Sequence, residues 1–444
     1  MMTNHEQARV VLSPSDLVRM RRVRWITFGL LALAFMLAFF HRLAPAVLSS
    51  ELQQAFRTSG VELGLLAAAY FYAYMLMQIP SGVLADTLGA RKAVTIGLTL
   101  AGLGGLLFAF AEGIGLAMVG RFLIGAGVAF GFLSMLKVIS QWFFDRQFAT
   151  YTGLTILLGN VGAMFSATPL AWALGFTGWR MIFVILGTAS LLLAVLVACL
   201  VRNRPGDIGL PSMRALEGKP DHAPMQVHWL SGLKRVVRNA QTWPGFVSSF
   251  CQGGAFFSFT GLWAVPYLRD IHGMSRAVAA DHVTLLLIGF AIGSMSIGMI
   301  SDRMGRRRPV MLACFWLNIL SWLPLVLCWR MPSVASWALF VLFGISSSGY
   351  TITLATTKEH NAPALSGMAN GVVNTGTFLG AAVLQPFLGW AMDYGWDGAL
   401  VDGVRAYSAL NYQVGFGILV LALVIGLVFA YRVKETFCQY QVSE

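Results

Sequence analysis

The sequence GVLADTLGARK at residues 82–92 returns as GMISDRMGRRR at residues 298–308, which is 216 positions later. Both copies stand between two long apolar runs and keep the same glycines, the same aspartate and the same basic ending. A second pair of markers has nearly the same offset, because Pro169 and Pro386 are 217 positions apart and each is followed nine residues later by Gly-Trp. Two markers at one spacing indicate that the chain consists of two related halves.

The composition is typical of a membrane protein. Of the 444 residues, 57% are hydrophobic and only 11% are charged, whereas about 25% are charged in soluble proteins. The net charge of +12 could indicate a nucleic-acid partner, but the basic residues fall in short connections between apolar runs. We therefore expect the lipid bilayer as the surroundings and no nucleic-acid partner.

Twelve apolar runs are long enough to cross a bilayer, whose hydrocarbon core requires about 20 residues per helix. They lie near residues 25–48, 61–84, 93–111, 115–138, 148–171, 180–201, 245–268, 280–300, 309–329, 335–356, 366–390 and 412–432. The sequence thus predicts an all-α membrane protein with twelve transmembrane helices in two pseudo-symmetric six-helix bundles.

A Pro- and charge-rich stretch separates the two sets of six runs. The predicted parts are an N-terminal cytoplasmic tail (1–24), a first bundle (25–201), a central cytoplasmic linker (202–240), a second bundle (241–432) and a C-terminal cytoplasmic tail (433–444). The end of the linker, from Trp229 to Arg238, has the pattern of an amphipathic surface helix.

The basic residues predict the orientation. The chain has 31 Lys and Arg, of which three lie inside apolar runs. The other 28 lie in the connections and tails. Of these, 22 lie on the same side of the membrane as the N-terminus and six lie on the opposite side. Because cytoplasmic loops carry the excess of Lys and Arg, both termini are expected in the cytoplasm. The polar first residues lack the apolar core of a signal peptide, so no cleaved presequence is expected. A bacterial inner membrane is the expected location.

Twelve runs, halves of six, a central loop and a repeated Gly-x-x-x-Asp-x-x-Gly-x-Arg loop together resemble the major facilitator superfamily over nearly the whole chain. The second loop copy matches the family pattern fully, while the first departs at Thr87 and Ala90, where the family usually has basic residues. Arg121, followed by Gly125 and Gly127, resembles the family's motif in helix 4. The resemblance implies transport by alternating access between the two halves.

The glycines of the repeated loop are expected to shape the backbone. Gly82 and Gly298 would permit close helix packing, and Gly89 and Gly305 would permit the tight turn between helices. Basic residues follow the turns: Arg91 in the first copy, and Arg306 and Arg307 in the second.

The resemblance implies that the loop aspartates act as a gate in the outward-facing state. Asp86 would face the N-terminus of helix 11, and Asp302 would face that of helix 5, where a carboxylate is favoured by the helix dipole. The alternative is that both are solvated charges in a turn.

Arg42 is the strongest candidate for binding, because an ionisable side chain inside an apolar run is costly. The chain resembles most closely the anion:cation symporter branch, in which helix 1 often has an acid followed by Arg. There the Arg binds an anionic group of the substrate and the acid takes part in proton coupling. Here Arg42 keeps the first role, and His41, which can titrate near neutral pH, stands where the acid would be. The alternatives are that Arg42 snorkels to the interface and that His41 is a hydrogen-bonded packing residue.

The other charges inside the apolar runs have less defined roles. Arg121 is expected to be structural or to gate, and Lys137 either snorkels or adds a second cation to the cavity. None of the 19 acidic residues lies clearly mid-membrane, and Val128 stands where the symporter branch often has Glu. A cavity with cations and no fixed anions favours an anionic solute.

Polar side chains at helical spacing extend the candidate site. Tyr70 and Tyr74 are one turn apart in the second run and are expected near Arg42 in the family's packing. Asn374 belongs to a polar face of the eleventh run, with Asn370 and Thr377. For each of them the alternative is hydrogen bonding between helices.

These residues predict a permease that moves a small organic anion, such as a sugar acid, carboxylate or phosphate ester, by proton-coupled uptake. The alternative is an importer or exporter of a siderophore, an amino acid or another metabolite. The chain has no catalytic motif and no phosphate-cradling Gly-Lys-Ser/Thr, so neither an enzyme nor direct use of ATP is expected. A sensor is disfavoured because no loop exceeds about 40 residues. We expect no cofactor, no metal and a monomer.

Overall fold

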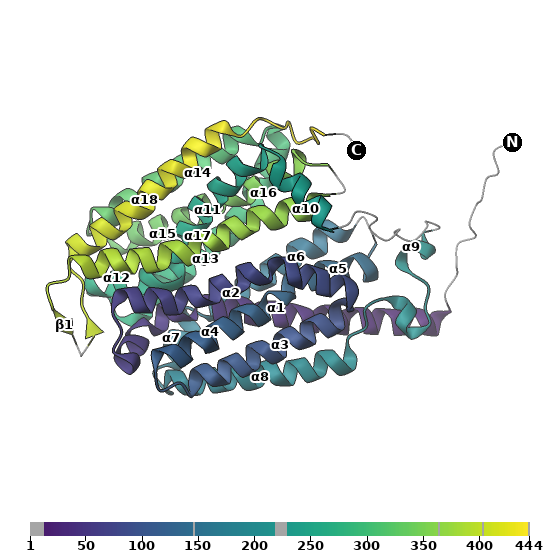
Figure 1. Cartoon of the computed structure of the whole chain (residues 1–444), viewed down its shortest axis with the longest axis horizontal. Coiled ribbons are helices and arrows are strands. Elements are labelled where there is room, and N and C mark those ends of the chain that lie inside the picture. The colour runs from purple at the N-terminus through teal and green to yellow at the C-terminus, as the bar shows by residue number, and fades with distance from the viewer. Residues whose placement is uncertain (1–12, 145–146, 218–228, 363–364, 402–403, 443–444) are drawn as a thin grey trace.

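The computed structural model describes residues 13–144, 147–217, 229–362, 365–401 and 404–442, which form two helical bundles side by side (Figure 1). The first bundle contains α1 (Pro14–Phe56), α2 (Gly60–Thr87), α3 (Gly89–Ala109), α4 (Ile114–Val128), α5 (Phe130–Trp142), α6 (Phe148–Phe165), α7 (Thr168–Ala173) and α8 (Trp179–Leu200). The connection to the second bundle contains η2 (Pro205–Ile208), α9 (Met213–Leu216) and α10 (Trp229–Arg238).

The second bundle contains α11 (Thr242–Ser258), the π turn η3 (Phe259–Trp263), α12 (Ala264–Asp270), α13 (Arg276–Met304), α14 (Arg308–Val326), α15 (Ser333–Ser347), α16 (Tyr350–Glu359), α17 (Ser366–Tyr394) and α18 (Ala409–Arg432). A two-stranded antiparallel hairpin, β1 (Leu400–Val401) and β2 (Val404–Arg405), lies between α17 and α18.

The predicted number of crossings is confirmed within the described ranges. Eleven segments are long and apolar enough to cross a bilayer, and three of them consist of two helices in line, namely α4–α5, α6–α7 and α15–α16. The twelfth crossing is α11–η3–α12, whose π turn interrupts the helix. Irregular backbone of this kind occurs in membrane helices where it is buried in protein or lines a cavity.

Polar side chains cap the starts of several long helices, including α1 and α2. Ser13 caps the first turn of α1 and Pro14 occupies it, so α1 begins inside the segment expected to be a tail. Ser59 and Glu62 form a capping box at the start of α2. The first helix is therefore longer than its apolar run at 25–48.

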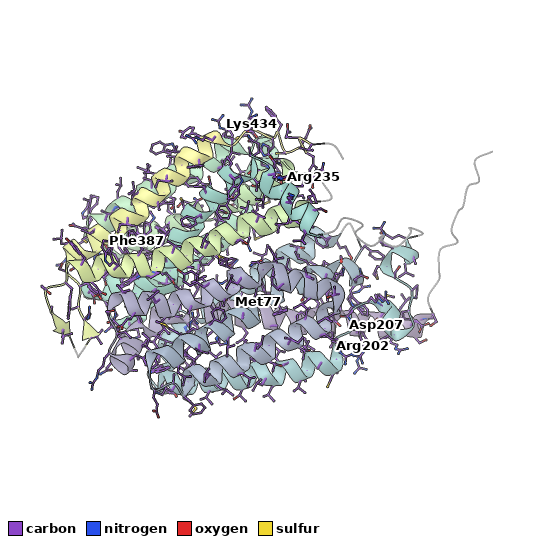
Figure 2. The ribbon with its side chains drawn as sticks, in the orientation of Figure 1. Met77, Arg202, Asp207, Arg235, Phe387 and Lys434 are labelled. Atoms are coloured by element: carbon purple, nitrogen blue, oxygen red, sulfur yellow. The ribbon has the colours of Figure 1, made fainter. Side chains whose placement is uncertain are left out.

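The two ends of the bundles differ in charge. We call the end where α1 begins and α18 ends the terminal side, and the end where α1 ends and α2 begins the far side. Figure 2 places Arg202, Arg235 and Lys434 on the terminal side. The amphipathic helix predicted from Trp229 to Arg238 is confirmed as α10, with the same bounds.

The duplicated loops share one backbone form. Gly89 and Gly305 have φ angles of +81° and +65°, which agrees with the tight turns expected at these glycines. In each half, a polar side chain caps the helix that follows the loop. This side chain stands three residues after the end of the last helix of the same half. Asn203 accepts an N–H of α3 at 2.9 Å, and Glu435 accepts N–H groups at the start of α14 at 2.8 and 3.0 Å. The duplication thus includes the capping partner of each loop.

Glu435 holds the C-terminal segment against the second loop. Its carboxylate accepts the backbone N–H groups of Arg307, Arg308, Thr436 and Phe437. Partial burial alone would raise the pKa of the Glu435 carboxyl, but these donors stabilise the charged form and hold the pKa below its ordinary value. The ionised carboxylate therefore stabilises the attachment of the segment, together with contacts such as that of Thr436 with Glu359.

Glu435→Gln is expected to release the C-terminal segment at neutral pH. A carboxyl group with a lowered folded pKa stabilises the folded form above that pKa and loses the contribution as the pH falls through it, so the wild type should release the segment in acid. The mobility of a spin label at the exposed residue Gln439 measures both effects. Glu112→Gln, an exposed position on the far side, is the control. Equal mobility in both variants would show that Glu435 does not hold the segment.

The glycines of the helix 4 motif are in backbone contact with neighbouring helices. A Cβ at Gly125 would lie 2.2 Å from the carbonyl oxygen of Tyr70 in α2, and one at Gly127 would lie 2.3 Å from that of Gly97 in α3. The helices therefore approach closely at Gly125 and Gly127, as small residues permit. At Gly131 the nearest atom would be 3.6 Å away, which is an ordinary contact.

Gly125→Ala is expected to lower stability by about 1–3 kcal/mol, because a methyl group there meets backbone that cannot move aside without shifting α2. Thermal unfolding of the purified protein in detergent would measure the loss. Gly131→Ala is the matched control, since its methyl group has room in the same crossing. The close packing would be irrelevant to stability if the two variants unfolded at the same temperature.

Polar contacts join the two bundles at the far side. Asp393, near the end of α17, accepts the backbone N–H groups of Gly60 and Val61 at the start of α2, at 2.9 and 2.8 Å. Glu51 of α1 forms an ion pair with Arg276 of α13. A hollow near this end has a volume of about 20 Å³. The far side is therefore closed.

Toward the terminal side the bundles separate. Among the described side chains, the ring contacts between α2 and α17 end with Tyr74 against Phe378, whose centroids are 4.4 Å apart. A Cβ at Gly298 or Gly371 would meet no other atom within 4 Å, and one at Gly82 would meet only a leucine of its own bundle. The close packing expected at Gly298 is thus not made in this conformation. Figure 1 shows the bundles converging at the far side and diverging toward the terminal side.

Asp302 is paired inside its own bundle. Arg307 donates to Asp302 and, at 2.9 Å, to Glu359, while Asp302 remains 64% exposed. The expected gate between Asp302 and helix 5, which corresponds to α6, is not formed among the described residues in this conformation. It stays a prediction for the outward-facing conformation. The side chain of Asp86 lies outside the described part of the structure.

Candidate functional site

Arg42 lies where the two bundles meet. Its side chain is 3% exposed, and its Nε donates to the Tyr70 hydroxyl at 3.4 Å. That hydroxyl donates in turn to the carbonyl of Ala38, one turn earlier in α1, at 3.2 Å. The structure describes no hydrogen bond for the two Nη atoms of Arg42, since the bond to Tyr70 comes from Nε. Tyr70 therefore holds one edge of the guanidinium and leaves the other edge for another partner.

Five aromatic rings surround the guanidinium, and we call them the Arg42 cage. Their centroids lie 4.4, 6.0, 5.0, 5.4 and 4.9 Å from its Cζ, for Phe39, Tyr70, Tyr74, Phe257 and Phe378 in that order. The first three belong to the first bundle and the last two to the second. Ring faces stabilise a desolvated cation by roughly 0.5–2 kcal/mol each without neutralising its charge.

No acidic side chain among the described residues pairs with Arg42. The described ion pairs lie near the ends of the bundles, as for Glu51 with Arg276 and Arg307 with Glu359. A snorkelling Arg42 is excluded, because its side chain is buried between the bundles rather than extended to an interface. The positive charge is therefore available to an anion that enters between the bundles.

Pro45 explains how Arg121 is attached to α1. A proline inside a helix leaves the carbonyl four residues earlier without its backbone donor, and here that carbonyl belongs to His41. Arg121 of α4 donates to it from Nη1 at 2.7 Å. Arg121 is fully buried, with its Cζ 5.1 Å from the Tyr70 ring. The structure thus places Arg121 behind the Arg42 cage, inside the first bundle, and its structural or gating role stays a prediction.

His41 faces the interior of the first bundle. Its ring is fully buried, 6.0 Å from the ring of Phe183 in α8. Consecutive residues of a helix point about 100° apart, which turns His41 away from the face of Arg42. The packing part of the alternative agrees with this burial, whereas neither ring nitrogen has a hydrogen-bond partner among the described atoms. Both ring nitrogens of His282, in contrast, are bonded.

The structure brings the predicted tyrosines and Asn374 to the same region. Tyr70 and Tyr74 stack with centroids 6.1 Å apart. Asn374 is half-buried one turn before Phe378 of the cage, and residues four apart share a helix face. Thr377 does not join them, because its hydroxyl donates to Ser249 at 3.2 Å inside the second bundle. Substrate contact by Asn374 stays a prediction.

Lys137 does not lie beside Arg42. It is half-buried in α5, 12 residues beyond Gly125, whose backbone touches that of Tyr70. At 1.5 Å per residue, this separation is about 18 Å along the crossing, toward the terminal side. A contact of Lys137 with the substrate would therefore belong to the path from the terminal side rather than to the cage.

Three of the five rings in the Arg42 cage, those of Phe39, Phe257 and Phe378, were not predicted from the sequence. Phe257 stands two residues before the π turn η3, and a Cβ at Gly261 in that turn would lie 4.0 Å from the backbone oxygen of Arg42. Interrupted crossings at the meeting of two repeats commonly form transporter sites. Phe378 follows Asn374 by one helical turn, but nothing in the sequence distinguishes it from the other phenylalanines.

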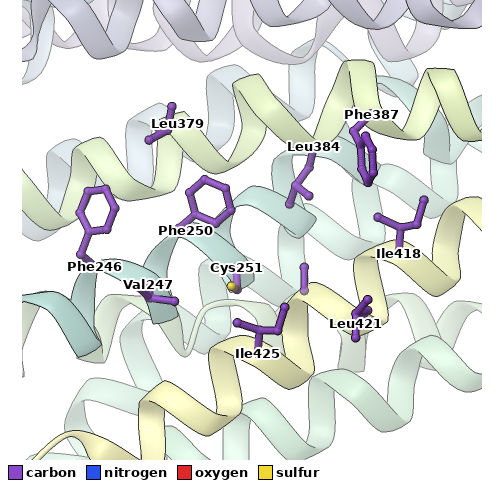
Figure 3. Close-up of a pocket in the computed structure, with 11 residues that line it drawn as sticks. Phe246, Val247, Phe250, Cys251, Leu379, Leu384, Phe387, Ile418, Leu421 and Ile425 are labelled. Carbon is purple, nitrogen blue, oxygen red and sulfur yellow. The ribbon is translucent and has the colours of Figure 1, made fainter.

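A separate hollow of about 440 Å³ lies among α11, α17 and α18 (Figure 3). All of its lining side chains are apolar, from Phe246 and Phe250 in α11 to Phe387 in α17 and Ile425 in α18. Such a surface offers no charged or hydrogen-bonding side chain to an organic anion. The hollow is therefore not part of the Arg42 site.

Comparisons with known proteins agree with the fold. The chain is 24% identical over 297 residues to the probable sulfoacetate transporter SauU of Cupriavidus necator, a match that covers 64% of this chain and 66% of that relative, just under two thirds of its length. It is 25% identical over 360 residues to the membrane sensor protein UhpC of Escherichia coli, covering 77% and 80% of the two chains.

A solved structure of a bacterial homologue of the human lysosomal transporter Spinster, inward-facing and unoccupied, superposes with a TM-score of 0.72. It covers 93% of this chain and 97% of its own, at 16% identity, so this similarity shows the fold alone.

The family model described as Major Facilitator Superfamily matches residues 27–280 and 246–438, which together span nearly the whole chain. The match agrees with the twelve crossings, the duplicated loops and the two bundles. This match and the long apolar helices show a multi-pass membrane protein. The chain therefore belongs to the Major Facilitator Superfamily.

Proposed function

We propose that the protein is a permease of the bacterial inner membrane that takes up a small organic anion, with Arg42 as the anion-binding group. The observation that carries this proposal is the buried guanidinium of Arg42 between the two bundles, with no described acidic partner. A guanidinium donates two parallel N–H groups to a carboxylate, sulfonate or phosphate. The name of the relative SauU, which refers to the organic anion sulfoacetate, supports an anionic cargo.

The excess of basic residues on the terminal side favours a cytoplasmic location for that side. In this orientation the conformation described above is closed to the outside and open to the cytoplasm. Because Arg42 is in contact with rings of both bundles, rocking of the bundles would expose it alternately to either side.

Protons are the proposed coupling ion, and His41 is the proposed proton carrier. Among the described histidines of the membrane crossings, His41 has two ring nitrogens without partners, whereas those of His282 are bonded. The described acidic residues lie near the ends of the bundles, as Glu51 and Asp393 do. A histidine is the side chain whose ordinary pKa lies nearest to neutral pH.

Uptake into proteoliposomes under an imposed pH gradient tests the proposal. A panel of carboxylates, sulfonates, sugar acids and phosphate esters should contain solutes that accumulate when the outside is acidic and stop accumulating when a protonophore is added. His41→Gln should lose this accumulation while exchange of the anion without a gradient continues.

Two results would overturn the proposal. Accumulation of amino acids, siderophores or other metabolites without a net negative charge, and of no anion, would favour the general metabolite transporter. Binding without any uptake would indicate a sensor, which is the function in the name of the relative UhpC.

A further inference from the structure

We propose that the anion bound by Arg42 has a flat aromatic body, as an arene carboxylate or an arene sulfonate has, rather than the hydroxylated chain of a sugar acid. The proposal rests on the proposed function, since it specifies the cargo of that site. Once the charged group of the anion has reached Arg42, the body of the anion would touch the side chains around the Arg42 cage.

Parallel ring faces stand next to the guanidinium. Phe257 and Phe378, both in the Arg42 cage, are inclined by only 23° with centroids 5.9 Å apart, and Phe71 is inclined to Phe378 by 22° at 6.2 Å. Stacked rings with centroids 4.5–7 Å apart attract one another when they are offset. The three rings are buried against one another, so a flat ring beside Arg42 would pack against an aromatic wall contributed by α2, α11 and α17.

A second row of rings continues this surface into the second bundle. Tyr350 of α16 lies within electrostatic range of the Arg42 guanidinium. Its ring stacks on Phe290 at 6.0 Å, and Phe290 stacks on Phe256 at 4.6 Å. The side of the site that the second bundle contributes is thus largely aromatic.

Many of the hydroxyl groups in this region are already bonded. The hydroxyl of Tyr70 is engaged by Arg42 and by a backbone carbonyl. Ser249 shares hydrogen bonds with Thr353 and Thr377 inside the second bundle. A sugar acid brings several hydroxyl groups, and each one that is buried without a partner lowers its affinity. An arene brings none that must be satisfied.

The side chains of Tyr74, Tyr350 and Asn374 near the cage have no described hydrogen bond. The Oε1 atom of Gln385, whose amide donates to the backbone oxygen of Phe257, is also buried without a described partner. These groups are spread over three helices, whereas the rings lie side by side next to the guanidinium. The polar groups therefore suit a ring with one or two polar substituents better than a polyhydroxylated chain. The balance of ring faces to free polar groups therefore favours the aromatic anion.

Calorimetric titration of the full-length protein in lipid nanodiscs tests this proposal with three monoanions: benzoate, cyclohexanecarboxylate and gluconate. Benzoate should bind at least tenfold more tightly than gluconate, and more tightly than cyclohexanecarboxylate, which has a similar size and the same charge but no aromatic face. The comparison uses the wild type, so it does not depend on the folding of a variant.

Two variants in α17 test whether the preference for benzoate arises at the Arg42 cage. Phe378→Ala should weaken benzoate at least tenfold and change gluconate little. Phe387→Ala, which removes a half-exposed ring of α17 outside the cage, should leave benzoate unchanged. Thermal unfolding of both variants shows whether they are folded.

The outcomes separate this proposal from the one on which it rests. Gluconate that binds as tightly as benzoate, with binding lost in Arg42→Ala, would overturn the aromatic body and support the anion permease. Equal binding of benzoate and cyclohexanecarboxylate would also overturn it, because an apolar body alone would then suffice. Binding of the anions that is unaffected by Arg42→Ala would overturn the proposed function, and this proposal with it.

Discussion

Arg42→Ala is expected to abolish uptake of the anion while the protein remains folded in the membrane. Truncating one partner of a buried ionic contact costs about 2–5 kcal/mol, and each 1.4 kcal/mol is a factor of ten in affinity. Affinity for the anion should therefore fall by a factor between about 30 and several thousand. The concentration dependence of uptake in proteoliposomes measures this change.

Arg42→Lys separates charge from geometry. Lysine keeps the positive charge, but it lacks the planar fork that meets a carboxylate with two hydrogen bonds, and it loses the flat contact with Phe39 and Phe378. Its affinity should lie between those of the wild type and Arg42→Ala. Removing Arg42 takes away no described ion pair, but it takes away the hydrogen bond to Tyr70 and the ring contacts of the cage, so thermal unfolding of each variant is measured beside uptake.

Arg19→Ala is the matched control for these variants. Arg19 lies in the same helix as Arg42 but is exposed at the terminal side, so its loss should leave both uptake and thermal unfolding unchanged. Wild-type uptake by a correctly folded Arg42→Ala would mean that the cage binds something other than the charged group of the cargo.

The fold could be predicted from the sequence because it depends on features that are local or repeated. Apolar runs of about 20 residues define the crossings, and the copies of the loop at 82–92 and 298–308 define the two halves. The exact ends depended on side-chain caps, as Ser13 shows for α1. The interruption of α11 by η3 had no such signal, since its sequence FTGLW is as apolar as its surroundings.

The candidate site could be predicted only in its charged part. Arg42 stands out because a charge inside an apolar run is rare, and Tyr70 and Tyr74 stand out through their spacing. The rings of Phe257 and Phe378 do not stand out among 31 phenylalanines, because what selects them is how the second bundle packs against α1. The sequence places His41 in the same predicted site as Arg42 because the two residues are adjacent. The rotation of the helix between them turns His41 into the first bundle and Arg42 toward the second.

Asp393→Asn is expected to shift the protein toward a conformation that is open on the far side. Four donors converge on this carboxylate: the N–H groups of Gly60 and Val61, the guanidinium of Arg405 at 2.8 Å and the hydroxyl of Tyr407 at 2.8 Å. Two of the donors come from α2, so the carboxylate of one bundle stabilises the helix N-terminus of the other. This is the arrangement that the resemblance implies for the loop aspartates at the opposite side of the membrane, so the far side would have a latch of the same kind.

The size of the shift follows from the contact that is lost. A hydrogen bond to a charged group contributes about 1.5–3 kcal/mol, so the closed population should fall by a factor of about ten to a hundred relative to the open one. Asp393→Ala should have a larger effect, because it also removes the acceptor. Distances between spin labels at Glu112 and Ser333, two exposed far-side positions of different bundles, measure the change and should lengthen in both variants. Glu62→Gln is the control, since Glu62 caps the same end of α2 from within its own bundle. If the distances in the Asp393 variants matched those of this control, the far side would be held closed by contacts such as that of Glu51 with Arg276 and not by Asp393.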